Sequence, residues 1–311
     1  MAKEFQQIVW NTELRDNWEQ ILQIAVREDL GEWGDWTTQA LVPQESQGRA
    51  AVVARRAGIL AGEPTVAMTL QHFDPELRWA AAARDGQTIA RGQCVGRIEG
   101  PARGLLAAER PLLNLLGRLS GIATLTRRYV DALAGSTARI YDTRKTTPGW
   151  RKLEKYAVHC GGGCNHRMGL FEAVLIKDNH LALGAELSPR GRGGYSPAEA
   201  VAAARRYLES RRGEAGRAMI VEVEVDTLEQ FEQVLAAGPD LVLLDNMGPA
   251  GLCAAVARRN AGYPGIELEA SGGIDLATVR EIAQCGVERI SIGALTHSVA
   301  SLDFGLDWRP L

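Results

Sequence analysis

The feature that most constrains the fold is an alternation, from Ala138 onward, of short apolar runs with stretches of helical periodicity. The runs are too short for core helices and read as strands that are buried on both faces. Several helical stretches follow a residue that suits a helix entry, such as Ser196 or Asp275. Strands alternating with helices predict parallel βα units, in either a barrel or a doubly wound sheet. The predicted strands are 138–142, 173–176, 219–225, 241–245, 266–270 and 289–293, and the predicted helices are 197–212, 227–237, 249–260 and 276–285.

The first part of the chain follows a different pattern. Helical stretches at 17–30 and 111–133 bracket a region that reads as antiparallel strands, at 48–62, 79–83 and 87–98. We therefore expect a separate α+β domain over residues 1–134, followed by the α/β domain over 135–295. The glycine-rich, polar segment 183–197 is expected to be a tolerated surface insertion.

Composition excludes several classes of protein. A net charge of −3 argues against general nucleic-acid binding, which requires a basic excess. Charges interrupt the first 18 residues, and no apolar run is long enough for a membrane span, so neither a signal peptide nor a membrane protein is expected. Five cysteines, an odd number, predict reduced thiols in the cytoplasm.

Positive charge is concentrated between Arg144 and Lys177. This window has a net charge of +5, so the rest of the chain has −8. A basic cluster in an acidic protein indicates a site for a small, multiply charged anion, although a solvated basic face is the alternative. Parallel sheets bind ligands at the carboxyl ends of their strands, and all six predicted strands end in polar residues or glycine.

These strand ends carry cations that suit an anion with two carboxylates. The planar guanidinium groups of Arg144 and Arg167 can each form two hydrogen bonds with a carboxylate, and Lys145 and Lys177 add positive charge. Four converging cations would repel one another unless an anion offset them. For Lys177 alone, the competing interpretation is the Schiff-base lysine of a barrel aldolase.

Acidic and glycine-rich strand ends complete the pattern. Glu224 and Asp245 are expected to meet Mg2+ brought by a phosphorylated substrate, or ribose hydroxyls, although general acid–base catalysis by the pair is an alternative. Glu222 should share the face of Glu224 and could be the working acid instead. The glycines after Ser271 and around Gly293 predict contacts to a phosphate.

The sequence resembles the quinolinate phosphoribosyltransferase family in motifs that run in the family's order from about residue 27 to 298. The central motif runs from Tyr156-Ala-Val through Gly161-Gly-Gly-Cys-Asn-His-Arg-Met-Gly-Leu170 to Leu175-Ile-Lys-Asp-Asn-His180. Further matches are Asp142-Thr-Arg-Lys-Thr-Thr-Pro-Gly149 and Leu244-Asp-Asn-Met247. One departure is Glu172, where a shorter Asp is expected. Additional matches are Glu28-Asp-Leu-Gly31, Glu109-Arg110 and Ser120-Gly-Ile-Ala-Thr124.

The resemblance implies an amino-terminal α+β open sandwich domain followed by an incomplete α/β barrel, with the tail 296–311 returning to the first domain. It also implies a homodimer with shared active sites, which could assemble further into a hexamer, and Mg2+ as cofactor. The implied carboxylate ligands are Arg144, His166, Arg167 and Lys177, with Arg110 reaching in from the other subunit. The resemblance further implies that Lys145 lies between the two substrates and that Glu224 and Asp245 bind the ribose and Mg2+. The residues that it implies for the 5′-phosphate are Ser271, Gly272, Gly293 and His297.

The reaction that the resemblance implies joins quinolinate to the ribose of phosphoribosyl pyrophosphate, giving nicotinate mononucleotide, pyrophosphate and CO2 for NAD biosynthesis. The nearest alternative is a paralogous phosphoribosyltransferase of the same fold that is linked to molybdenum transport. An aldolase acting through Lys177 belongs to a different reaction class. A non-catalytic anion-binding protein is a third alternative, but it offers no reason for acids beside the cations.

Overall fold

The structure, a computed structural model, describes residues 3–184 and 194–309 and divides the chain into two compact units. The barrel unit comprises Met1–Gln6, Tyr129–Arg144 and Cys164–Gly293. The sheet unit comprises Gln7–Arg128, Lys145–Gly163 and Ala294–Leu311. This division differs from the predicted boundary at residue 134, because it groups the first six residues with the barrel and 145–163 with the sheet unit.

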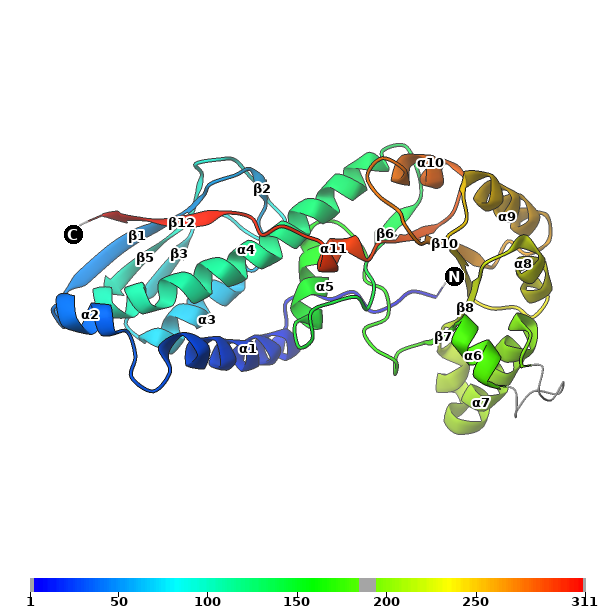
Figure 1. The fold of residues 1–311 in the computed structure, drawn as a ribbon, viewed down its shortest axis with the longest axis horizontal. Helices are drawn as coiled ribbons and strands as arrows, with labels where there is room; N and C mark the ends of the chain where they lie inside the picture. The colour runs from blue at the N-terminus through cyan, green and yellow to red at the C-terminus, as the bar shows by residue number, and fades with distance from the viewer. Residues whose placement is uncertain (1–2, 185–193, 310–311) are drawn as a thin grey trace. The chain divides into compact units, whose positions relative to one another are not determined.

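The barrel unit is built on six parallel strands in the order β6-β11-β10-β9-β8-β7 (Figure 1). Among the described residues β6 and β7 stand at the two ends of this order, so the barrel is incomplete. All six strands predicted from the sequence are confirmed, with bounds that differ by at most two residues. They are β6 (Arg139–Tyr141), β7 (Val174–Ile176), β8 (Val221–Val225), β9 (Leu241–Asp245), β10 (Glu267–Ser271) and β11 (Arg289–Ser291).

Helices connect these strands, as parallel neighbours require. Ser196 caps α7 through a reciprocal pair of hydrogen bonds with Glu199, and Thr227 caps α8 by accepting from the Gln230 amide. The helices are α6 (Asp178–Leu183), α7 (Pro197–Ala218), α8 (Leu228–Leu235), α9 (Pro249–Gly262) and α10 (Val279–Gln284).

The sheet unit contains a four-stranded antiparallel sheet in the order β12-β1-β5-β3. Its strands are β1 (Gln47–Ala54), β3 (Arg78–Ala81), β5 (Cys94–Pro101) and β12 (Phe304–Arg309), while β2 (Gly58–Ile59) pairs with β4 (Thr88–Ile89). The chain's tail therefore returns to β1 as β12, as the resemblance implies. The helices are α1 (Thr12–Leu30), α2 (Trp36–Leu41), α3 (Glu63–Phe73), α4 (Ala102–Ala132), α5 (Arg151–Cys160) and α11 (Ala294–His297).

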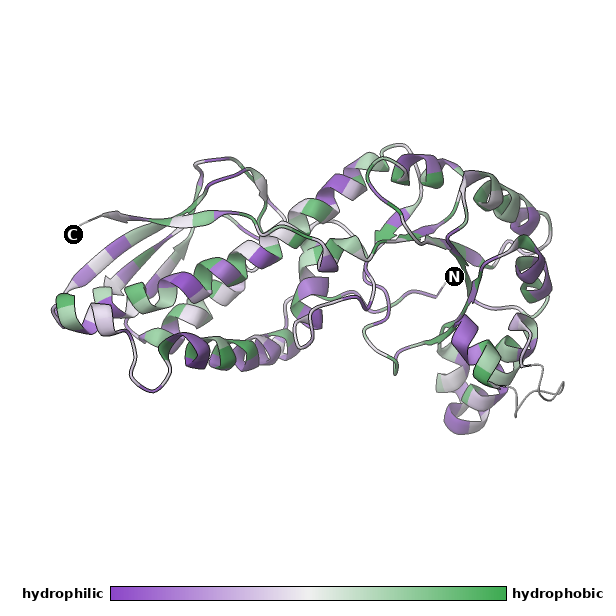
Figure 2. Cartoon of the chain, in the orientation of Figure 1, coloured by the Kyte–Doolittle hydropathy of each residue, from purple (hydrophilic) through white to green (hydrophobic). Residues whose placement is uncertain are grey.

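One apolar core holds this unit together. It joins alternate residues of β1, and Val95 and Ile98 of β5, to α3 and α4, with Val52, Leu70 and Leu105 fully buried. Figure 2 shows the matching alternation of hydrophobic and hydrophilic residues along α1 and α4.

The prediction that a helix begins at Pro111 is wrong. Helix α4 begins at Ala102 and contains Pro111 in its interior, although proline there costs roughly 3 kcal/mol. The buried apolar face continues across this position through Leu105, Ala108 and Leu112, so packing outweighs the local penalty. Helices α3 and α5 were not predicted. The sequence of α3 comes directly after a run that reads as strands, and the sequence of α5 is rich in charge.

The predicted surface insertion at 183–197 falls largely outside the described residues. Among the residues that the structure does describe, no helix combines the length and the apolarity needed to cross a bilayer.

Two glycines let the tail approach α4 closely. The Leu302 amide donates to the Gly117 carbonyl at 2.9 Å, and one turn later Gly121 faces the Ala300 carbonyl. A Cβ added at Gly117 would lie 2.7 Å from the Leu302 carbonyl oxygen. Since the obstacle is backbone, it cannot rotate away, and the contact requires glycine at both positions.

We therefore expect Gly117→Ala and Gly121→Ala to lower the free energy of unfolding by about 1–3 kcal/mol, the usual cost of overpacking. The matched control is Gly251→Ala in α9, where the new Cβ would meet only Met247 at an ordinary 3.7 Å. This control should be neutral or should stabilise by roughly 0.5–1 kcal/mol through helix propensity. Chemical denaturation measures all three. Equal stability of the three variants would contradict the tail-packing account.

Candidate active site

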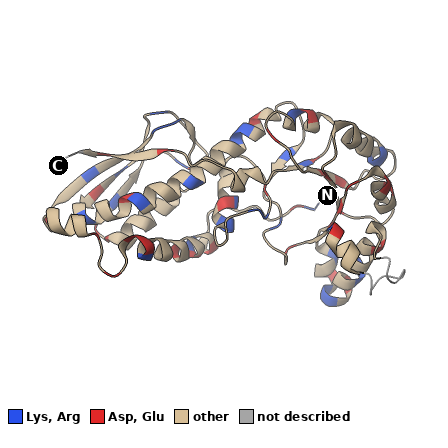
Figure 3. Cartoon of the chain, viewed as in Figure 1, with Lys and Arg blue, Asp and Glu red and all other residues tan. Residues whose placement is uncertain are grey.

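The parallel sheet brings the predicted residues of the barrel unit to one edge. Since neighbouring strands run in the same direction, their carboxyl ends lie side by side. Figure 3 marks the charged positions of this unit on the ribbon. Arg144 follows β6, Lys177 follows β7, Glu224 lies in β8, Asp245 ends β9, Ser271 and Gly272 close β10, and Gly293 follows β11.

Two guanidinium groups lie within electrostatic reach of each other at this edge. Arg167 is 6% exposed, and its Nη1 donates to the Ala173 carbonyl at 3.0 Å. Burial lowers the pKa of Arg167, the charge of Arg144 lowers it further, and Glu222 acts in the opposite direction. Because the two like charges repel each other and one of them is buried, binding of an anion by both would be favourable.

The loop that carries Arg167 is fixed by Asp142, at the end of β6. One Asp142 carboxylate oxygen accepts from the His166 amide at 2.9 Å, and the other accepts from Asn165 Nδ2 at 2.7 Å. All three residues are buried, so these hydrogen bonds are costly to lose. Sequence reasoning did not assign this role to Asp142, although its place at a strand end was the available signal.

The geometry fixes the tautomer of His166. The Arg167 backbone amide donates to His166 Nδ1 at 2.8 Å. A backbone amide can only donate, so Nδ1 is the unprotonated nitrogen and the ring proton resides on Nε2. Nε2 lies 3.1 Å from a Glu222 carboxylate oxygen and 3.6 Å from one of Glu269.

His166, Glu222 and Glu269 form a buried group with the spacing of metal ligands, since their ligand atoms lie within 4.8 Å of one another. A metal would need the lone pair of Nε2, which carries the proton in this tautomer. The group therefore fits a metal ion poorly. Burial raises the pKa of Glu269 to about 7, while His166 lowers it and the neighbouring Glu222 raises it.

A second acidic pair lies at the open end of the strands. Glu224 forms an ion pair with Lys177, and its pKa is raised by burial and by the nearby Asp245, while Lys177 lowers it. Glu222, two residues earlier on β8, is fully buried, whereas the Glu224 side chain is 11% exposed. Of these two acids, Glu224 is thus the one at the open end of the strand.

The aldolase interpretation of Lys177 gains no support from its surroundings. A Schiff-base lysine is activated by desolvation or by a neighbouring cation. The Lys177 side chain is instead 43% exposed and pairs with a carboxylate.

The loops after β9 and β10 contain residues in the left-handed region of backbone conformation. Asn246 has a φ of 54°, and its amide donates to the Ser271 carbonyl at 2.9 Å. Gly272 and Gly273 have φ values of 95° and 60°, which favour glycine, and a Cβ at Gly272 would overlap the Asn246 side chain. The Asn246 side chain also donates to Asp245 at 2.6 Å, which orients that carboxylate.

Three predicted residues belong to the sheet unit. Arg110 is exposed on α4, and Lys145 is exposed with its carbonyl accepting from the Thr296 hydroxyl at 2.8 Å. His297 ends α11, exposed, with Nδ1 2.6 Å from the Ser298 hydroxyl.

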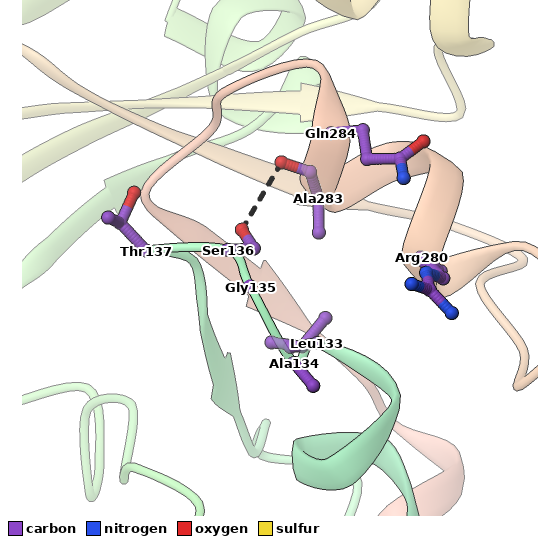
Figure 4. A pocket seen from close by; sticks show the side chains of 8 residues that line it. All are labelled: Leu133, Ala134, Gly135, Ser136, Thr137, Arg280, Ala283 and Gln284. Atoms are coloured by element: carbon purple, nitrogen blue, oxygen red, sulfur yellow. Dashed lines mark hydrogen bonds between the residues drawn. The ribbon is translucent and has the colours of Figure 1, made fainter.

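A cavity of 340 Å3 in the barrel unit lies apart from these residues (Figure 4). It is lined by the segment that precedes β6 and by α10, which precedes β11, so it lies toward the amino ends of the strands. Ser136 closes one side by donating to the Ala283 carbonyl at 3.4 Å, and Arg280 supplies the only charge among the lining residues. Ligand binding is expected at the opposite, carboxyl ends.

Family models match almost the whole chain. The model "Quinolinate phosphoribosyl transferase, N-terminal domain" matches residues 35–120, and "Quinolinate phosphoribosyl transferase, C-terminal domain" matches residues 122–307.

Curated relatives and a solved structure agree with these matches. The nicotinate-nucleotide pyrophosphorylase [carboxylating] of Mycobacterium leprae is 42% identical over 91% of this chain and 94% of its own length. A probable enzyme of the same name from Bacillus subtilis is 40% identical over 90% of this chain and 89% of its own. The structure of the nicotinate-nucleotide pyrophosphorylase from Francisella tularensis matches with a TM-score of 0.86 at 32% identity, covering 98% of this chain and 100% of that one.

Proposed function

The chain belongs to the quinolinate phosphoribosyltransferase family, and we infer that it transfers the phosphoribosyl group of phosphoribosyl pyrophosphate to quinolinate. The products are nicotinate mononucleotide, pyrophosphate and CO2, in a step of NAD biosynthesis. The observation that carries this conclusion is the placement of Arg144 and of the buried, anchored Arg167 with Lys177 at the carboxyl ends of the parallel strands. Quinolinate, with two adjacent carboxylates, is an anion that these residues can bind.

We propose that Arg144, His166, Arg167 and Lys177 bind the two carboxylates. The Ala173 and Asp142 hydrogen bonds hold Arg167 and the loop that carries it before substrate arrives, so little reorganisation is needed on binding. Arg110, Lys145 and His297 keep the roles that the family resemblance implies.

The chemistry requires charge stabilisation more than covalent participation by the protein. The bond between ribose C1′ and the pyrophosphate oxygen breaks, and the oxygen keeps the electron pair. The pyridine nitrogen then donates its lone pair to C1′, which gives a cationic ring. Loss of CO2 from the adjacent ring carbon leaves an electron pair that this cation stabilises, and a proton takes the vacated position. Positioning of the two substrates supplies much of the rate.

We further propose that the loops after β10 and β11 bind the 5′-phosphate through Ser271, Gly272 and Gly293. The left-handed conformation of Gly272 allows close approach of backbone N–H groups to phosphate oxygens. This assignment leaves the ribose near Glu224 and Asp245, on the neighbouring strands β8 and β9.

We propose that Mg2+ binds mainly to the substrate and that Glu224 and Asp245 are its ligands from the protein. Oxygen ligands suit this ion, and a divalent cation would offset the burial of the Glu224 carboxylate and its smaller repulsion from Asp245, both of which raise the pKa of Glu224. When bound with the substrate, Mg2+ would neutralise charge that develops on the departing pyrophosphate.

The oligomeric state and the location in the cell are proposals too. We propose a homodimer in which Arg110 completes the site of the other subunit, as the resemblance implies, and assembly of such dimers into a hexamer is compatible with this arrangement. A cytoplasmic location remains the prediction made from the sequence.

The first prediction concerns substrate choice. With phosphoribosyl pyrophosphate and Mg2+, the enzyme should turn over quinolinate and not nicotinate, as followed by nicotinate mononucleotide and CO2. Arg144→Ala and Lys177→Ala should each reduce kcat/KM by about 100-fold or more, since each removes a charged hydrogen-bond partner of roughly 3 kcal/mol. Arg258→Ala, which breaks an exposed pair with Glu232, is the matched control. Absence of product from quinolinate in a folded preparation would move the assignment to the paralogous transferase.

The second prediction concerns the metal. Chelation should abolish turnover, and added Mg2+ should restore it. Glu224→Gln keeps the shape of the side chain but removes its charge, so the Mg2+ concentration for half-maximal activity should rise. Glu232→Gln, at an exposed position of α8, is the control and should leave the Mg2+ requirement unchanged. An unchanged Mg2+ requirement in Glu224→Gln would remove Glu224 from the proposed metal site.

The third prediction tests shared active sites. Arg110→Ala and Lys177→Ala should each be nearly inactive alone, but co-expression should recover roughly a quarter of wild-type activity. Half of the dimers formed at random are mixed, and each of these has one intact site. Failure to recover activity in mixed dimers of demonstrated composition would show that Arg110 serves its own subunit.

A further inference from the structure

The amino-terminal segment Lys3–Gln6 is part of the barrel unit and is fastened inside it by Arg289 of β11. Arg289 is fully buried, and its Nη2 donates to the Lys3 carbonyl at 2.9 Å while its Nη1 lies 3.1 Å from Glu4 Oε1. Tyr141 of β6 donates its hydroxyl to the other Glu4 oxygen at 2.8 Å. Two strands of the barrel therefore bind one side chain of this segment.

Further contacts fasten both ends of the segment. Lys3 Nζ donates to the carbonyls of Arg217 and Met219, each at 2.9 Å. At the other end the Gln6 amide donates to Glu172 at 3.1 Å, and the second oxygen of Glu172 accepts from the Met168 amide. The glutamate that departs from the family pattern thus joins the segment to the loop that carries His166 and Arg167.

Between these anchors, Phe5 packs against the site. Its side chain is 3% exposed and stacks on the His166 ring, with centroids 4.3 Å apart and planes 29° from parallel. The Arg289 guanidinium lies over the Phe5 ring, 5.4 Å from its centroid. The His166 ring is therefore held by its face through Phe5, and Nδ1 is held by the Arg167 amide.

We propose that Phe5 is a positioning residue for the substrate site, which acts by holding the His166 ring and, through it, the Arg167 backbone in the orientation that binds a carboxylate. The proposal rests on the proposed function for its substrate. A ring that lost its stacking partner could turn about its side-chain bonds, and the Arg167 amide would then lose the acceptor that fixes it. The effect should thus appear in quinolinate binding and not in binding of phosphoribosyl pyrophosphate.

The test is Phe5→Leu in the full chain, which keeps an apolar side chain but removes the aromatic face. Stacked aromatic pairs contribute enough that the KM for quinolinate should rise about threefold to tenfold, with the KM for phosphoribosyl pyrophosphate within about twofold. The matched control is Phe304→Leu in the sheet unit, where Phe304 is buried in a different core. It makes the same change of volume and should leave both KM values unchanged, even where it lowers thermal stability.

Nitrogen NMR of the histidine rings gives a readout that does not depend on turnover. In the wild-type chain His166 should show a protonated Nε2 and an unprotonated Nδ1, and Phe5→Leu should shift or broaden these signals. An unchanged KM for quinolinate in an active Phe5→Leu enzyme overturns the proposal. If the wild-type chain does not turn over quinolinate, the proposed function fails and the ring signals decide alone. Altered His166 signals then support the contribution of Phe5, and unaltered signals overturn it.

Discussion

The barrel depends on a cation that has no access to solvent. Arg289 stands on β11 with its side chain fully buried, where an unpaired charge would cost several kcal/mol. Glu267 at 2.6 Å and Glu4 at 3.1 Å supply the opposite charge, and the Tyr141 and Phe5 rings lie against the guanidinium. The pairing joins β10, β11 and the amino-terminal segment, so the buried cation has opposite charge on two sides.

The same interior explains why the site can hold its cations ready. Asp142, Glu222 and Glu269 are buried acids behind the positive edge, and each lies against the His166–Arg167 loop or close to it. Their negative charge offsets part of the repulsion between Arg144 and Arg167. The buried acids thus hold the His166–Arg167 loop in one conformation, while the cations of the site still attract an anion.

The repeating half of the fold could be predicted from the sequence because parallel strands buried on both faces leave continuous apolar runs, and all six were located. The edge of the sheet that carries Arg144, Lys177, Glu224 and Asp245 followed from the same rule about strand ends. The contribution of Phe5 could not be predicted, since its partner is distant in sequence and a lone aromatic residue near a terminus has no pattern. The start of α4 was missed because proline was weighed by local preference, whereas burial of Leu105 and Ala108 decides it.

The link between Glu4 and Arg289 also sets an order on biosynthesis. The two residues are 285 positions apart, so the segment that fills the barrel is made early and its principal partner late. At roughly 5–20 residues per second, Glu4 waits about 15 to 60 seconds for β11 to be synthesised. The sheet unit has a similar delay, because β1 pairs with β12. Neither unit can therefore finish folding before β11 and β12 have been synthesised, and the nascent protein must remain soluble with both cores incomplete.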